Sequence, residues 1–230
     1  MARFKTYSIA TRDLVALAFA AYRVNGTVHK DAEYYDREQD TVVQVTPNKV
    51  LMRDSFAIEP GSNPELVPSE QDLQDADAAI EGIQSHILLQ KLSDRQINSF
   101  VQTIGESLAQ DTLTQRDCGL IAFVPKTWAG MQARQERQET VATLSTSSQY
   151  LGRVGDKVRV DFVMLDKRFL QQYNCWSVNG HDSNGNLVNF LTAHEHLAKS
   201  GSIQGKIKRT EVSQYHNGAQ VTQLNFVKAV

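Results

Sequence analysis

A short basic segment near the carboxyl terminus contains the residues best suited to bind a polyanion. Successive side chains of a β-strand point to opposite faces, so Lys206 and Lys208 would share one face and Ile207 would take the other. The two ammonium groups would then lie about 7 Å apart in a line, which suits the phosphates of a single nucleic-acid strand. The other cations predicted to contact such a ligand are Lys157, Arg159, Lys167, Arg168 and Arg209.

Aromatic residues in the same third of the chain could stack on unpaired bases, each contact contributing about 1–3 kcal/mol. Tyr173 and Tyr215 have polar neighbours in the sequence, which favours exposure. Trp176 fits a stacking role and a core position equally well. Phe162 and Phe226, which alternate with polar residues, are predicted to fill the interior of the fold.

The sequence offers no recognisable catalytic or metal-binding pattern. It lacks a glycine-rich nucleotide loop, a zinc-finger spacing and a nucleophile elbow. The imidazoles of His194 and His196 would diverge on a helix, where a metal pair is spaced four residues apart. The segment that begins at Asp182 resembles a calcium-binding loop, but the twelfth position, where such a loop needs Glu, is occupied by Ala193. We therefore expect a protein without a cofactor or metal and without enzymatic activity, although a scattered active site stays an alternative.

Five predicted strands and one short helix must position these side chains. Two Asn-Gly pairs, ending in Gly185 and Gly218, suit tight hairpins between strands. The order of strand, strand, strand, helix, strand and strand matches an OB-fold barrel, and a meander or small sandwich is the alternative. The predicted strands are 157–164, 173–178, 187–191, 203–215 and 220–230, and the predicted helix is 193–199.

Several motifs of this region resemble a domain of bacteriophage replication-region proteins. They are Tyr150–Val158, His181–Asn186, Gly205–Arg209 and Gln220–Lys228, with Leu92–Gln96 resembling a box that often precedes the domain. The resemblance covers roughly the last third of the chain. It implies an OB-like fold and binding of single-stranded nucleic acid, and no catalytic signature accompanies it.

The charge of the chain differs between its two parts. Residues 152–230 contain ten basic and six acidic residues, a net charge of +4. Subtraction from the totals of 24 and 26 leaves 14 basic and 20 acidic residues upstream, a net charge of −6. Two widely separated cysteines indicate a reducing compartment with structural thiols. No membrane-spanning run or secretory signal is recognisable, so we expect a cytoplasmic protein, in the host cytoplasm if phage-encoded.

The upstream part is predicted to be mainly helical with a small β-hairpin. A helix begins at Thr11, and two later amphipathic helices form a hairpin, the second capped by Ser93. The segment 118–124 fits a buried strand or the end of a buried helix. The predicted remainder comprises an exposed loop at 30–40, strands at 41–45 and 49–52, a helix beginning at Pro68-Ser69, and a helix at 127–140.

These patterns predict an α+β protein of two domains. Residues 1–145 form the mainly helical domain, and 146–230 form a five-stranded OB-like barrel. We expect a non-catalytic module of phage-type replication or recombination that binds single-stranded DNA, with RNA less favoured. Its amino-terminal region would contact replication or recombination proteins, and a homo-oligomer is compatible with the sequence. The alternative is a protein–protein interaction or inhibitor protein that uses the barrel as a scaffold.

Overall fold

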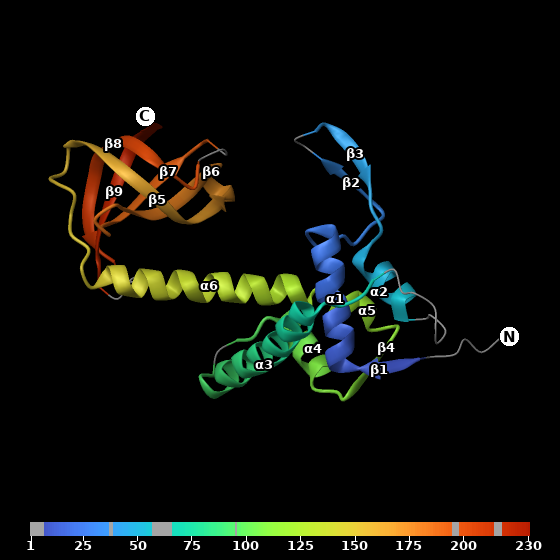
Figure 1. Cartoon of the computed structure of the whole chain (residues 1–230). Helices are drawn as coiled ribbons and strands as arrows, with labels where there is room; N and C mark the ends of the chain where they lie inside the picture. The colour runs from blue at the N-terminus through green and yellow to red at the C-terminus, as the bar shows by residue number, and fades with distance from the viewer. Residues whose placement is uncertain (1–6, 37–38, 57–65, 95, 195–197, 214–217) are drawn as a thin grey trace. The chain divides into compact units, whose positions relative to one another are not determined.

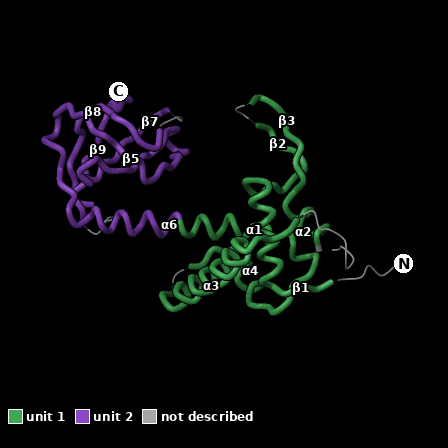
Figure 2. Tube along the Cα trace, in the orientation of Figure 1, with its two compact units in different colours: residues 1–132 green, residues 133–230 purple. Residues whose placement is uncertain are grey.

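The computed structural model describes residues 7–36, 39–56, 66–94, 96–194, 198–213 and 218–230 (Figure 1). Contacts between residues divide the chain into two compact units, 1–132 and 133–230 (Figure 2). Their border lies inside the long helix α6 (Val124–Ser145), whereas the predicted domain boundary coincides with the end of that helix. Each unit is described by itself.

The first unit is built around the apolar helix α1 (Thr11–Asn25), which ends at Gly26 in the left-handed conformation with φ 70°. It packs against α2 (Asn48–Phe56), α3 (Glu70–Leu92) and α5 (Cys118–Ile121). Two short strands, β1 (Ser8–Ala10) and β4 (Thr112–Thr114), pair antiparallel beside it. The predicted helix beginning at Thr11 is confirmed, and its alanines and leucines form the centre of the core.

Helix α3 begins with a reciprocal capping box between Ser69 and Asp72. Burial raises the pKa of Asp72, but hydrogen bonds from Arg23 and Ser69 outweigh it and hold that pKa below its usual value. Helix α4 (Ser99–Leu108) packs against α3 as the predicted helical hairpin. Gly105 permits their close approach, because a Cβ there would lie 2.1 Å from Cδ1 of Ile87.

Several predicted elements of this unit differ in the structure. Ser93 is the C-cap of α3, where its hydroxyl donates to the carbonyl of Leu89, and Asn98 caps α4 instead. Residues 49–52 belong to helix α2 rather than to a strand. The predicted exposed loop contains strand β2 (Glu33–Asp36), which pairs antiparallel with β3 (Thr41–Gln44) and is mostly exposed.

In the segment 118–124, residues 118–121 and 124 are helical and 122–123 form a turn, so the helix alternative is correct. It forms α5 and the first residue of α6, and its Cys118 is 2% exposed. Burial raises the pKa of the Cys118 thiol to about 11, so this thiol is protonated at neutral pH. The predicted helix at 127–140 lies within α6, which extends further in both directions.

The second unit contains a closed five-stranded barrel in the order β5-β6-β7-β9-β8. Strands β7 and β9 are parallel, and the other neighbours are antiparallel. The first three strands follow one another in space as they do in the sequence, and the last two appear in reversed order. This topology is OB-like, so the predicted α+β fold with a carboxyl-terminal barrel is confirmed. The strands are β5 (Lys157–Leu170), β6 (Cys175–Asp182), β7 (Leu187–Thr192), β8 (Ser200–Val212) and β9 (Gln220–Ala229).

The sequence patterns account for much of the barrel. Val160, Phe162 and Val178 point into it and join a core cluster with residues of all five strands. Gly185 has φ 83° in the turn between β6 and β7, and the Asp182 carboxylate accepts hydrogen bonds from backbone N–H groups of that turn. This explains the calcium-like residues as part of a hairpin.

Two predicted features of the barrel fall partly on residues outside the described ranges. Of the expected helix at 193–199, the described residues 193–194 and 198–199 are not helical, and 195–197 lie outside. This leaves His196 undescribed. At the second Asn-Gly hairpin Gly218 has φ 79°, while 214–217, including Tyr215, lie outside the described residues.

Candidate nucleic-acid interface

Strands β5 and β8 bring together predicted cations that are distant in the sequence. Lys157 of β5 lies directly opposite Lys206 of β8, and Arg159 lies opposite Gln204. These four side chains are exposed, because the inward positions between them are filled by residues of the core. Two lysines face to face on neighbouring strands repel each other, so the arrangement destabilises the barrel unless an anion lies between them.

A β-bulge interrupts the predicted line of lysines at Lys208. Ile207 pairs with Leu224 and Arg209 pairs with Gln223, so Lys208 is an extra residue on β8. Lys208 remains exposed. The strict alternation that was expected to place Lys206 and Lys208 on one face therefore does not hold across this bulge.

A second bulge, on β9, exposes Phe226. Lys206 pairs with Asn225 and Gln204 pairs with Lys228, so two residues of β9 stand opposite Gly205. Phe226 has φ 54°, and its side chain is 80% exposed. The left-handed conformation is uncommon for a bulky residue and disfavours it by roughly 1–2 kcal/mol.

The predicted interior position of Phe226 is therefore wrong, whereas that of Phe162 is confirmed at 3% exposure. The extra residue shifts the alternation by one, so Val227 points toward the barrel core instead. Gly205 suits the position opposite, because a Cβ there would lie 3.2 Å from Cγ2 of Val227. Neither the bulge nor the exposure of Phe226 has a signal in the alternating sequence.

We call the resulting surface the basic face: Lys157, Arg159, Lys206, Lys208 and Lys228, with Phe226 among them. Lys228 is a functional candidate that the sequence analysis omitted. Among the described residues, no ion pair involves any of these five cations. Arg209 differs from them, because its Nη2 lies 3.0 Å from a carboxylate oxygen of Glu211.

Two carboxylates near the basic face form no ion pair with its cations among the described residues. Asp161, on the same strand as Arg159, accepts a hydrogen bond from the hydroxyl of Ser202. Asp156 accepts the backbone N–H of Arg153 at 2.8 Å. The five cations outnumber these two carboxylates, so the face keeps a net positive field that an added polyanion can satisfy.

The remaining predicted residues gather where β5 continues into β6. The short helix η1 (Gln171–Tyr173) joins the strands, and Tyr173 on it is 66% exposed. Lys167 Nζ lies 4.2 Å from the ring centroid of Trp176, and the rings of Phe169 and Trp176 are 5.0 Å apart at 57°. We call Lys167, Phe169, Tyr173 and Trp176 the aromatic cluster.

Phe169 was missed by the sequence analysis, although it is 44% exposed. Its neighbour Arg168 is also exposed, and Arg168 pairs with Ser177 while Phe169 pairs with Trp176. Two consecutive strand residues point to opposite faces, so Arg168 lies on the other side of β5 from the cluster. The sequence signal that could have identified Phe169 is its position near the end of a long strand, four residues before Tyr173.

The structure therefore divides the predicted site into two groups. Lys157 and Lys167 are ten positions apart on β5, which is at most about 33 Å along the strand. The first half of β5 pairs with β8 and the second half with β6. The predicted strand ended at Met164, whereas β5 continues to Leu170 and carries Lys167 away from the basic face.

Helix α6 covers another part of the outside of the barrel. Arg137 Nη1 lies 2.8 Å from a carboxylate oxygen of Asp166. Leu144 packs against the small buried cluster that contains Leu187 and Val221. The surface over this part of β5, β7 and β9 is therefore occupied by the chain itself, and the basic face lies on other positions of β5, β8 and β9.

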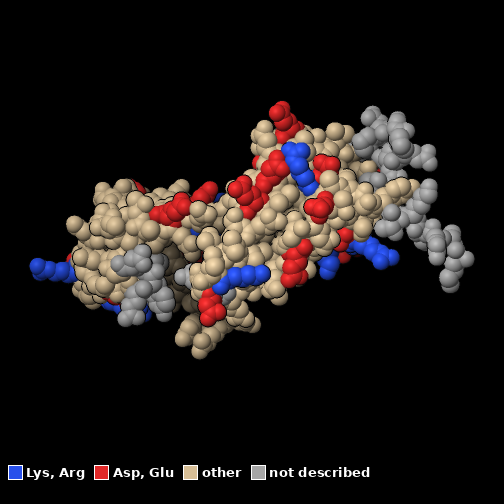
Figure 3. Space-filling model, turned by 90° about the horizontal axis from the view of Figure 1, so that it is seen from below, with Lys and Arg blue, Asp and Glu red and all other residues tan. Residues whose placement is uncertain are grey.

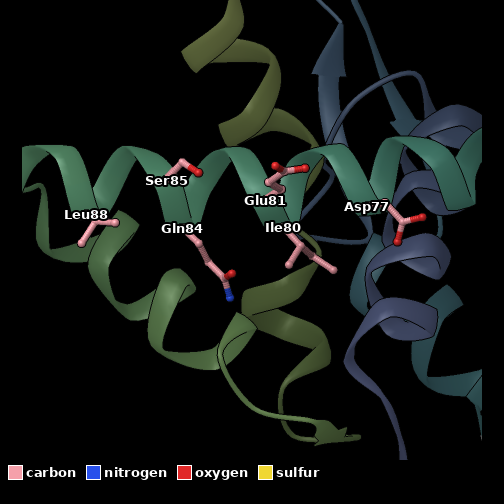
Figure 4. Close-up of a pocket in the computed structure, with 6 residues that line it drawn as sticks. All are labelled: Asp77, Ile80, Glu81, Gln84, Ser85 and Leu88. Atoms are coloured by element: carbon pink, nitrogen blue, oxygen red, sulfur yellow. The ribbon is translucent and has the colours of Figure 1, made fainter.

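The hollow along helix α3 shows no convergent chemical groups. The residues that line this hollow of about 410 Å³ all belong to that one helix (Figure 4), and two of them are engaged with other helices, Asp77 with Arg12 and Gln84 with the carbonyl of Leu108. Among the described residues, no group of three or more His, Cys, Asp or Glu side chains could hold a metal ion. Within the same residues, no helix has the length and apolar character needed to cross a bilayer.

The chain has no match among protein-family models, curated proteins or solved structures.

Proposed function

We propose that this protein binds single-stranded nucleic acid, DNA in preference to RNA, through its basic face and without catalysing a reaction. The observation that carries the proposal is Phe226, held exposed in a disfavoured backbone conformation among five cations that have no ion pair within the described residues. Cations that follow the phosphates and an aromatic ring that stacks on a base are the two elements of sequence-tolerant single-strand binding.

A role in phage-type replication or recombination is supported by the resemblance of the carboxyl-terminal motifs to bacteriophage replication-region proteins. The protein would act in the cytoplasm, that of the host if a phage encodes it. In this role it would protect or present single strands, and the first unit would contact other replication or recombination proteins. Binding would show little sequence preference, because phosphates and ring faces are common to all nucleotides.

Fluorescence anisotropy with a labelled oligo-dT of sixteen nucleotides tests the proposal. Five phosphate contacts predict a slope of about −3.5 for the logarithm of affinity against that of salt, roughly a 100-fold loss between 50 and 200 mM. A mixed-sequence strand should bind within a few-fold of oligo-dT, and oligo-U should bind more weakly. Absence of binding at 50 mM salt, or an affinity independent of salt, would contradict the proposal.

A second candidate function, recognition of another protein, is favoured by the exposed surface of the first unit. Leu88, Leu89 and Leu92 at the end of α3 are 59%, 63% and 75% exposed. Carboxylates are prominent around the helices on the face in Figure 3, so the expected partner has a basic surface. Retention of such a partner after nuclease treatment, unchanged in a Lys206→Glu/Lys208→Glu variant, would favour this function over nucleic-acid binding.

A further inference from the structure

The aromatic cluster has no role in the binding surface proposed above, although it contains two exposed rings and a cation. Phe169 and Tyr173 are 44% and 66% exposed, so a planar ligand can reach both rings. Trp176 packs against the barrel core and against Phe169, and this fixes the position of the exposed ring. A site that is rigid before binding loses little conformational entropy when a ligand arrives.

The ligand that fits this cluster is an unpaired base with its phosphate. An apolar ring face suits any planar ligand, but the cluster also holds the ammonium group of Lys167, 4.2 Å from the ring centroid of Trp176. Stacking rings beside an ammonium group select a planar group that carries negative charge. A nucleotide has both properties, whereas a proline-rich or apolar peptide lacks the charge.

The cluster and the basic face belong to one barrel and are separated by a limited length of strand. Lys157 and Lys167 are ten positions apart on β5, at most about 33 Å. When two sites lie on one rigid body, a ligand bound at the first is present at the second at a high effective concentration. A sufficiently long strand therefore gains affinity from the second site without any change in the first.

Resting on the proposed function, we propose that the aromatic cluster is a second nucleotide subsite, and that one strand must span the basic face and the cluster to bind tightly. Oligonucleotides too short to reach both would bind through one site alone. The protein would thus discriminate by strand length, favouring extended single-stranded regions over short ends or gaps.

Affinities of the full chain for oligo-dT of four and sixteen nucleotides test this subsite, since OB folds bind about 4–16 nucleotides. The Phe169→Ala/Tyr173→Ala variant is expected to bind the sixteen-nucleotide strand on the order of tenfold more weakly and the four-nucleotide strand within about twofold of the unmodified protein. Tyr35→Ala, which removes an exposed tyrosine of β2 in the first unit, is the matched control and should change neither affinity.

Equal weakening for both lengths, or no weakening for either, would overturn the subsite. Failure of the unmodified protein to bind either strand would instead overturn the proposed function, so the two failures are distinguishable. Thermal unfolding of the variant is measured alongside. An unfolding temperature equal to that of the unmodified protein shows that any loss comes from the removed rings.

Discussion

Reversing two charges on the basic face, with Lys206→Glu and Lys208→Glu, is expected to weaken binding of single-stranded DNA by at least about 100-fold at 50 mM salt. The five cations then become three cations and two carboxylates, so the net charge of the face falls from +5 to +1. Loss of two phosphate contacts should also make the salt dependence shallower by roughly 1.4 in slope. Anisotropy titrations over several salt concentrations measure both quantities.

The matched control for this variant reverses two exposed lysines of the first unit, Lys49 on α2 and Lys91 on α3. Both double variants change the net charge of the chain from −2 to −6, because each Lys→Glu exchange subtracts two. The control should retain most of the affinity and the full salt slope. Equal losses in the two variants would mean that overall charge, rather than the basic face, determines binding.

Replacing Phe226 with glycine is expected to stabilise the fold while weakening binding. The side chain is 80% exposed, so little apolar burial is lost, and glycine adopts φ 54° without the steric cost that a phenylalanine meets. The free energy of unfolding should rise by about 1 kcal/mol. Affinity for single-stranded DNA should fall by about 1–3 kcal/mol, the contribution of one stacked base.

Opposite signs in these two measurements identify a residue that is retained for binding at a cost in stability. Leu191→Gly on β7 is a suitable control, because Leu191 is also exposed and its backbone does not have positive φ. That exchange should lower stability by roughly 0.5–1 kcal/mol and leave affinity unchanged. A destabilised Phe226→Gly protein with normal affinity would show that the ring has a structural role.

Local signals in the sequence identified most elements of the barrel. Alternation placed Val160 and Phe162 inside, and Asn-Gly pairs located the turns, because these features depend on residues close in the chain. Residues 49–52 were misassigned because four residues suit a strand or a helical turn equally well. Ser93 was predicted as the cap because Gln96 follows it at capping-box spacing, and only the tertiary structure shows that Asn98 begins α4.

The candidate site was less predictable than the fold. Its cations were identified from composition, but bulges at Lys208 and Phe226 depend on the partner strand and leave no mark on the alternation of either one. Lys228 joined the basic face only through its pairing with Gln204. The separation of the aromatic cluster from that face likewise follows from the length of β5 and its change of partner.

Photo-crosslinking of the full chain to a bromodeoxyuridine-substituted single strand, with the adducts located by mass spectrometry, tests the central claim most directly. We predict adducts on Phe226, with further adducts on the aromatic cluster for strands of sixteen nucleotides, and loss of all of them at high salt. Adducts confined to the first unit, or to the surface that α6 covers, would contradict the assignment of the basic face as the binding site.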